Sequence, residues 1–190
     1  MKTIVWKGYK NMKENYIDLL KSTNRKGIDK LIKWLEQETD FFTAPASTKY
    51  HLSKEGGLLE HSLNVYVELL DEYFEDNIES MIIVSLLHDI CKANYYTVSE
   101  RNVKKDGFWI KEPYYTVDDQ FPVGHGEKSV MIIQRFIKLS DEEVAAIRWH
   151  MGAYEPKENY GSLGQAFNKY PLALYLHIAD LKATYIKESE

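Results

Sequence analysis

The amino-acid sequence predicts an all-α bundle that carries one inserted β-hairpin. Apolar residues recur with helical spacing through most of the 190 residues, which is the main signal for amphipathic helices. This spacing is interrupted over residues 94–119, which are rich in Tyr, Thr, Val and Trp. Lys105-Asp106-Gly107 in that segment is a turn signal between two strands. We therefore expect helices on both sides of a single hairpin.

Eight segments of the chain have the spacing of helices. Their expected bounds are residues 12–22, 27–38, 58–74, 78–92, 125–138, 141–151, 163–169 and 171–187. The helix over residues 78–92 is apolar on nearly all sides at its centre, so we expect it to be the buried central helix. In the first two helices, six aliphatic side chains are expected to face inward: Ile17, Leu20, Ile28, Leu31, Ile32 and Leu35.

Local signals mark where several of these elements begin. Ser140 and Glu143 form a capping box for the helix at residues 141–151. Pro171 suits the first turn of the last helix. The strands are expected near residues 95–104 and 108–116, and Pro113 places the second at an edge, because proline cannot donate to a ladder.

The length predicts roughly one domain. We expect residues 1–44 to form N-terminal helices that pack on a domain over residues 45–190, with its hairpin at about residues 94–119. The 44% apolar content is enough for a core and argues against a disordered chain.

Composition also restricts location and partners. No apolar run approaches about 18 residues, and the N-terminal segment lacks the features of a signal peptide. The single cysteine, Cys91, excludes an internal disulfide framework and fits a reducing compartment, so we expect a cytoplasmic protein with no membrane partner. With 24 basic and 29 acidic residues, the net charge of −5 disfavours general binding of extended duplex nucleic acid.

The histidines are the candidate functional residues. There are six: His51, His61, His88, His125, His150 and His177. His88 and Asp89 form a His-Asp pair in the expected central helix, and Asp180 lies in an apolar stretch of the last helix. Buried imidazole and carboxylate groups are costly unless they are paired or bound to a metal.

The spacing of these residues indicates a shared site. Gaps of 25 to 36 residues separate His61, the His88-Asp89 pair, His125, His150 and Asp180. Each gap is about one helix plus a return, so antiparallel helices can bring one ligand each to a common level. Imidazole and carboxylate together suit Fe, Mn, Zn, Co or Ni. For any single buried histidine, a satisfied core position is the alternative.

Three segments carry a family resemblance, namely GGLLEHSLNVY, SLLHDICK and HIADLKATY. Their order His…His-Asp…Asp resembles the HD-domain metal-dependent phosphohydrolase superfamily, from about Pro45 to Tyr185. The segment that leads into His61, PAS…YHLSKEGGLLEHSLNV, is similar to that of HD-domain 3′-to-5′ exoribonucleases, but the OB-fold that those enzymes usually carry is missing. GHGEKSV and IRWHMGAYE resemble two extra histidine motifs of HD proteins that hold two metals. The chain reads HDICK where many members read HDIGK.

The resemblance implies a helical fold that holds two divalent transition metal ions. The implied ligands of the first ion are His61, His88, Asp89 and Asp180, and those of the second are Asp89, His125 and His150. The implied activity is hydrolysis of a phosphoester or phosphoanhydride bond in a nucleotide or short oligonucleotide. We expect Asp89 and Lys92 to be catalytic, because Lys92 follows three residues later on the same helix face and could hold a phosphate oxygen.

Five further residues are expected to contact substrate: His51, Lys54, Trp109, Tyr115 and Lys128. The hairpin lies between Asp89 and His125 in the chain, so we expect it to overhang the site, where its aromatic side chains could stack on a base. The alternatives are surface positions for the loop histidine and the lysines, and ordinary strand composition for the aromatic residues. His177 is expected to serve core packing, and Cys91 is not expected to be a nucleophile.

Two other classes of function remain open. One is a metal-holding module that binds or senses a nucleotide without turnover. The other is a helical interaction domain without metal. Turnover of a phosphodiester distinguishes the enzyme from the first class, and metal analysis of the purified protein distinguishes it from the second.

Overall fold

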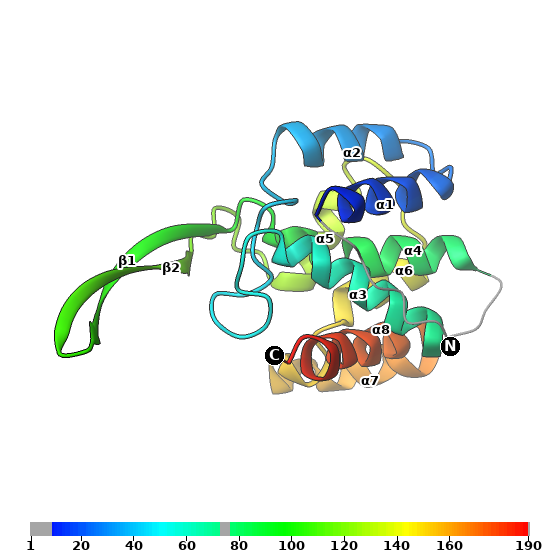
Figure 1. The fold of residues 1–190 in the computed structure, drawn as a ribbon. Helices are drawn as coiled ribbons and strands as arrows, with labels where there is room; N and C mark the ends of the chain where they lie inside the picture. Colours follow the sequence, from blue (N-terminus) through cyan, green and yellow to red (C-terminus); the bar gives the residue numbers. More distant parts are fainter. Residues whose placement is uncertain (1–8, 73–76, 190) are drawn as a thin grey trace.

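The computed structural model describes residues 9–72 and 77–189 (Figure 1). Over these residues the chain forms eight α-helices and one two-stranded antiparallel sheet, which confirms the predicted all-α bundle with a hairpin. The helices are α1 (Tyr9–Ser22), α2 (Ile28–Gln37), α3 (Gly57–Glu72), α4 (Ile78–Leu87), α5 (His125–Ile133), α6 (Asp141–Trp149), α7 (Tyr160–Lys169) and α8 (Pro171–Lys182). Within the described ranges, none of them is long and apolar enough to cross a bilayer.

The helices form layers around α4, which lies at the centre of the bundle. In Figure 1, α1 and α2 lie above α3, α4, α5 and α6, while α7 and α8 lie below. All residues from Ser80 to Leu87 are buried, as the uniformly apolar sequence of α4 predicts. α3 packs against α4 and α8, and α6 packs against α5 and α8. The helices that carry the candidate histidines therefore surround α4 or pack beside it.

The N-terminal helices pack onto this core through the predicted side chains. The five expected inward residues that are fully buried are Leu20, Ile28, Leu31, Ile32 and Leu35. Ile17 is partly buried against the same cluster. The last residues of the helix expected at 58–74 lie outside the described residues, as does the segment 1–8.

A buried ion cluster connects the loop after α1 to α4 and α6. The Arg25 guanidinium donates to both carboxylate oxygens of Glu143, at 2.8 and 3.1 Å, and also pairs with Glu79. Ser80 Oγ donates to the same Glu143 carboxylate at 2.7 Å, and the Ser140 amide donates at 2.8 Å. The predicted capping box of α6 is confirmed, and its glutamate also serves this tertiary ion pair.

Three predicted helices end earlier than the apolar pattern indicates. α4 ends at Leu87, and a 3-10 turn, η1 (Ile90–Lys92), follows it. α5 ends at Ile133, and α8 passes at Lys182 into a π-helical turn, η4 (Ala183–Lys187). The His-Asp pair therefore lies at the C-terminal end of α4 and not inside a helix, because the backbone of Asp89 leaves the helical region (φ −101°, ψ 17°). Apolar spacing continues through the turn, so it could not locate this end.

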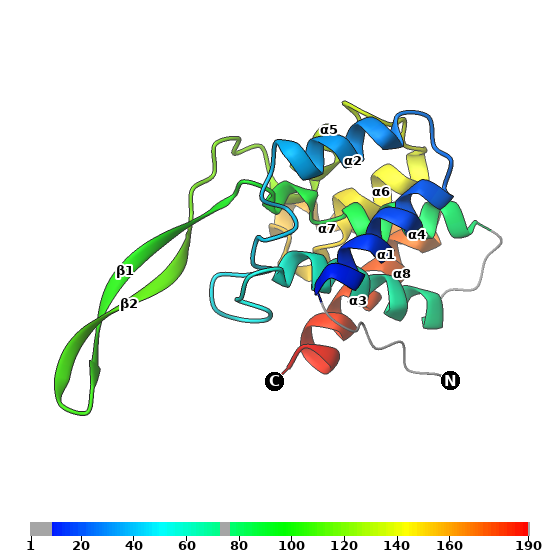
Figure 2. The same cartoon turned by 45° about the horizontal axis from the view of Figure 1, so that its top comes forward.

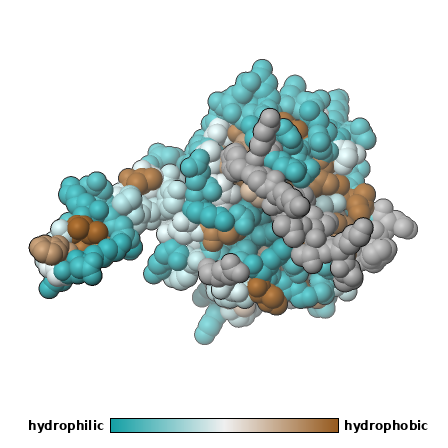
Figure 3. All heavy atoms as spheres, viewed as in Figure 1, coloured by the Kyte–Doolittle hydropathy of each residue, from teal (hydrophilic) through white to brown (hydrophobic). Residues whose placement is uncertain are grey.

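The hairpin consists of β1 (Tyr96–Lys105) and β2 (Phe108–Val117), close to the predicted strands. Asp106 and Gly107 both have positive φ, at 51° and 86°, as a two-residue type I′ turn requires. Figures 1 and 2 show the hairpin extending away from the helices, so the expectation that it overhangs the histidines was wrong. Within residues 9–72 and 77–189 its strands pair only with each other, and the Phe108 and Trp109 side chains at its tip are exposed. Figure 3 shows apolar side chains on this arm among hydrophilic ones.

Candidate metal centre

The six predicted ligands come together inside the bundle. α3 supplies His61, the ends of α4 and α6 supply His88 and His150, α5 begins with His125, and α8 supplies Asp180. Among the described residues, four three-residue groups have ligand atoms within 4.8 Å of one another. These groups are His51–His61–Glu188, His61–His88–Asp180, His88–Asp89–His150 and Asp89–Cys91–His125. Each predicted ligand occurs in at least one of them.

Three of the imidazoles are fixed through their Nδ1 atoms. His88 Nδ1 lies 2.8 Å from the Ser85 carbonyl oxygen, and His150 Nδ1 lies 2.7 Å from the carbonyl oxygen of Ile147. A carbonyl only accepts, so each Nδ1 carries the hydrogen and donates it. His61 Nδ1 faces the Glu188 carboxylate at 3.1 Å in the same way. The ring of His88, whose pKa is lowered by burial, is neutral and presents a lone pair at Nε2.

The Nε2 atoms of these rings converge on carboxylate oxygens. His61 Nε2 lies 3.3 Å from His88 Nε2 and 3.2 Å from Asp180 Oδ1. His150 Nε2 is buried without a hydrogen-bond partner, 3.5 Å from Asp89 Oδ1. Buried acceptors that face one another without donors are unfavourable unless protons or a cation lie between them. This donor set, imidazole with carboxylate, fits a divalent transition metal ion.

Asp89 lies between two groups of histidines. Its Oδ1 lies 2.7 Å from His125 Nε2 and faces the unpartnered nitrogen of His150. Its Oδ2 lies 3.6 Å from His88 Nε2 and 3.7 Å from His61 Nε2. Two oxygens that point to different imidazole pairs are what the predicted bridging ligand requires.

Burial and acidic neighbours shift the histidine pKa values in opposite directions. Burial lowers the pKa of His88 to about 4, so its ring is neutral at neutral pH. Burial also opposes protonation of His61, but hydrogen bonds to Asp180 and Glu188 outweigh it and raise the pKa to about 10. A proton on His61 thus balances the surrounding carboxylates, and a divalent cation would take its place.

Burial and charged neighbours also have opposite effects on the pKa values around Asp89. Burial would raise the pKa of this carboxyl, yet the Lys92 ammonium and the neighbouring histidines hold it well below its ordinary value. Burial likewise opposes protonation of His125, while Cys91 and Asp89 raise its pKa to about 10. The carboxylate therefore stays ionised inside the bundle, where it attracts positive charge.

Lys92 is a partly buried cation in this cluster. Its Nζ lies 2.6 Å from Asp89 Oδ2, and the side chain lines the cavity described below. Burial opposes its charge, but Asp89 outweighs this effect and raises the ammonium pKa above its ordinary value. The 3-10 turn after α4, and not a continuing helix face, brings the two residues together.

Glu188 is a residue that the sequence analysis missed. Its carboxylate is buried, faces His61 Nδ1 and accepts from Asn64 Nδ2 at 2.9 Å. The residue follows the π-helical turn in a charged segment, KESE, which reads as a solvated end. No local signal distinguishes it, because only the return of the chain onto α3 buries it. Cys91 also lies in the cluster, with Sγ 3.4 Å from His125 Nδ1.

A cavity of about 740 Å³ opens beside the predicted metal ligands. Four of the predicted ligands line it: His61, Asp89, His150 and Asp180. Its other walls include Tyr50, Met151, Tyr154 and Tyr185. This volume is within the range of roughly 300–1,000 Å³ that is typical of small-molecule sites.

His51 is the one predicted substrate contact that lines this cavity. Its ring centroid lies 5.0 Å from that of His61, and its Nε2 is buried without a hydrogen-bond partner. The His51 pKa is lowered, mainly by burial and then by His61, so the ring is neutral at neutral pH. A neutral imidazole at this position can exchange a hydrogen bond with a ligand in the cavity.

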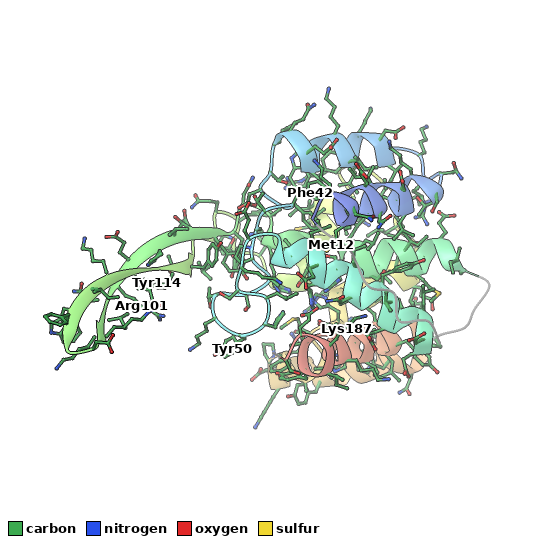
Figure 4. All side chains as sticks on the ribbon, in the orientation of Figure 1. Met12, Phe42, Tyr50, Arg101, Tyr114 and Lys187 are labelled. Carbon is green, nitrogen blue, oxygen red and sulfur yellow. The ribbon has the colours of Figure 1, made fainter. Side chains whose placement is uncertain are left out.

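The other four predicted contacts are not among the residues that line the cavity. Lys54 is exposed and pairs with Glu60 at 2.9 Å, while Lys128 is held at 2.6 Å by Asp119. Trp109 is 71% exposed near the hairpin tip, and Tyr115 lies on the same strand. Figure 4 shows the neighbouring hairpin residues Arg101 and Tyr114 far to one side of the bundle. The two lysines pair with carboxylates outside the cavity, and the hairpin does not fold back toward the cavity.

His177 packs beneath one ligand and also reaches the cavity lining. Its Nδ1 donates to the His150 carbonyl oxygen at 2.7 Å, and its ring stacks on Phe167. Gly152, at φ +53°, allows this contact, because a Cβ there would come within 2.2 Å of the imidazole. His177 therefore supports the turn that carries His150; it is half-buried and lines the cavity, so the core-packing role expected for it was wrong.

Comparison with known proteins gives one finding. The family model described as HD domain matches residues 58–186, about two thirds of the chain. Searches of curated proteins and of solved structures find no match. The matched range contains the six predicted ligands together with Lys92 and the hairpin. The chain belongs to the HD domain family.

Proposed function

We propose that this protein hydrolyses a phosphoester or phosphoanhydride bond of a nucleotide or short oligonucleotide. Its HD domain indicates the metal-dependent phosphohydrolase superfamily. The observation that supports this proposal most is the convergence of imidazole lone pairs on Asp89 at the wall of a small-molecule cavity. The same arrangement in a purely structural core would leave buried acceptors without donors.

Two groups of side chains are suited to hold two divalent transition metal ions. His61, His88, Asp89 and Asp180 would hold one ion. Asp89 would share the other with His125 and His150. Such ions, when bound, polarise a phosphoryl oxygen and lower the pKa of water.

The protein's own residues supply charge and orientation around the phosphate. Lys92 keeps its positive charge next to Asp89 and lines the cavity, so its ammonium can bind a phosphate oxygen and offset charge that develops there. His51 offers a neutral imidazole to the same space. Carbonyl contacts at Nδ1 fix the rings of His88 and His150, so little reorganisation accompanies substrate binding.

A metal-replete activity screen tests this proposal. The purified chain is loaded with Mn²⁺, Fe²⁺, Co²⁺, Ni²⁺ or Zn²⁺ and incubated with nucleoside phosphates, dinucleotides, short oligonucleotides and a chromogenic phosphodiester. Phosphate release and product mass are measured. Metal-dependent turnover that His125→Ala and His150→Ala reduce by orders of magnitude supports the two-metal enzyme.

The control variant and the contrary outcomes make the screen decisive. Asp29→Ala removes an exposed carboxylate on α2 and should keep full turnover. If both histidine variants also keep full turnover, the second metal position has no catalytic role. If metal binds but no substrate is turned over, the nucleotide-binding module without turnover is the better description.

A further inference from the structure

We propose that Tyr50, Tyr154 and Tyr185, hereafter the tyrosine wall, form a subsite that binds the base of the substrate while its phosphate faces the metal ligands. This inference rests on the proposed function and deepens it by naming the part of the substrate that the protein recognises. The sequence analysis placed base recognition on the hairpin, but the hairpin residues are not among those that line the cavity.

Three separate segments bring the tyrosine wall to one cavity. Tyr50 comes from the loop before α3, Tyr154 from the 3-10 turn η2 (Gly152–Tyr154), and Tyr185 from the π-helical turn after α8. All three line the cavity that also contains Asp89 and Lys92. Figure 4 shows Tyr50 on its loop, between the base of the hairpin and the C-terminal turn that carries Lys187. A ligand in this cavity therefore meets phenol rings and metal ligands together.

These side chains are largely exposed, and Lys49 Nζ lies over the ring of Tyr50, 5.1 Å from its centroid. Tyr50, Tyr154 and Tyr185 are 80%, 63% and 60% exposed, although each lines the cavity. Side chains that only filled the core would be buried, as Tyr16 is. Exposed aromatic residues gathered around a concave site are typical of ligand recognition. Aromatic rings stack on nucleobases, because every base has a π-face.

Two of the rings are fixed relative to each other before any ligand arrives. Tyr154 Oη and Tyr185 Oη lie 2.5 Å apart, which connects the turn after α6 to the turn after α8. Tyr160 Oη donates to the Ala153 carbonyl oxygen at 3.0 Å and holds the turn that presents Tyr154. A wall that is ordered in advance loses less conformational entropy when it binds a ligand.

The two ends of the cavity select for different parts of one molecule. Lys92 and the metal ligands suit a phosphate, while Met151 and the tyrosine wall suit a flat, partly apolar ring. The volume of about 740 Å³ matches a small ligand. The substrate class that fits both ends is a nucleoside phosphate, or the terminal nucleotide of a short oligonucleotide, and not a sugar or alkyl phosphate.

Binding measurements on the metal-loaded full chain test this inference apart from catalysis. The probes are adenosine 5′-phosphorothioate, which is hydrolysed slowly, and ribose 5-phosphorothioate, which lacks the base. Tyr154→Leu and Tyr185→Leu should each weaken binding of the adenosine probe by about 5- to 150-fold. Binding of the ribose probe should stay unchanged. Tyr154→Phe and Tyr185→Phe keep the rings and should bind the adenosine probe within about 5-fold of the wild type.

A matched control and separate outcomes keep the two proposals distinguishable. Phe108→Leu removes an exposed ring at the hairpin tip and should bind both probes as the wild type does. The inference is wrong if the wild type does not prefer the adenosine probe, or if the leucine variants weaken both probes equally or neither. If the preference is present and depends on the wall, but no nucleotide is hydrolysed, the base subsite stands and the proposed enzyme is wrong. If nucleotides are hydrolysed but the wild type does not prefer the adenosine probe, the proposed enzyme stands and the base subsite is wrong.

Discussion

Two clusters of buried charge in this bundle are built in opposite ways. Around Glu143, every acceptor has a donor, because Arg25, Ser80 and the Ser140 amide all point hydrogens at the carboxylate. Around Asp89, Lys92 Nζ and His125 Nε2 contact the two carboxylate oxygens, but the Nε2 atom of His150 is buried without a hydrogen-bond partner. The first cluster is complete without a ligand, whereas the second leaves an imidazole nitrogen that can bind a cation.

The contrast separates a structural ion cluster from a functional site. Burial by itself raises the pKa of a carboxyl in both places, and positive neighbours reverse this effect in both. A lowered carboxyl pKa therefore does not distinguish the two. What distinguishes them is the buried His150 nitrogen without a hydrogen-bond partner and the presence of a cavity beside Asp89. Variants that act on one cluster should leave the other unaffected.

The largest expected effect is on the metal cluster, from Asp89→Ala. Among the residues that the structure describes, Asp89 alone faces both histidine groups, so this variant should lose both metal ions. Phosphate release should fall by about 10³-fold or more, since bound metal ions contribute several kcal/mol to such reactions. Elemental analysis and a turnover assay measure the two effects. Normal metal content in this variant would contradict the bridging role of Asp89.

The next effect concerns the ion cluster around Glu143. Arg25→Met leaves the buried Glu143 carboxylate without its ion-pair partner, and the free energy of unfolding should fall by about 3 kcal/mol. Metal content per folded chain should not change. Lys13→Met breaks a more exposed pair, that with Glu36, and should cost about 1 kcal/mol or less. Urea denaturation of both variants measures the free energy of unfolding. An equal loss in the two variants would show that the buried ion pair is not more stabilising than the exposed one.

A smaller effect should follow from the residue that orients His61. Glu188→Ala removes the partner of His61 Nδ1 and should weaken metal binding by about 10- to 100-fold. Glu188→Gln keeps an acceptor there, so it should recover part of the affinity. Competition with a chromogenic chelator measures the metal affinity. The control is Glu72→Ala, which removes a carboxylate on α3 that pairs with Lys182. If alanine and glutamine behave like this control, Glu188 does not position the ligand.

The smallest effect is a pH dependence of the complete cluster. Burial would raise the Glu143 pKa, but Arg25 and its other donors hold it below the ordinary value of 4.5. A lowered folded-state pKa contributes stability above the unfolded pKa, and this contribution is lost as pH falls below about 4.5. The stability difference between wild type and Arg25→Met should therefore shrink as pH falls from 6 to 3. A constant difference would mean that Glu143 ionisation does not contribute.

The sequence predicted the local elements well where short-range chemistry determines them. The Asp106-Gly107 turn formed because both residues tolerate positive φ, and the capping box formed because Ser140 and Glu143 satisfy each other's amides. The end of α4 was different. Apolar spacing continues past Leu87, so it did not reveal that the backbone turns at Asp89.

Candidate ligands were predictable, whereas their surroundings were not. Histidines at intervals of one helix plus a return indicated a shared site, and the resemblance to the HD-domain superfamily implied His61, His88, His125 and His150 as ligands. Glu188 had no such signal, because a glutamate near charged neighbours looks solvated until the π-helical turn returns it to α3. Lys128 was expected at the site, but Asp119 holds it.

The sequence by itself determined the helical class and the hairpin, because periodicity and turn chemistry act within a few residues. Its resemblance to the HD-domain superfamily implied the residues that meet around Asp89. Only the tertiary structure decided that the hairpin extends outward and that Tyr50, Tyr154 and Tyr185 line the cavity instead. These arrangements depend on how segments far apart in the chain pack, and packing of this kind leaves no regular pattern in the sequence. The direction of an arm and the wall of a cavity are properties of the assembled bundle.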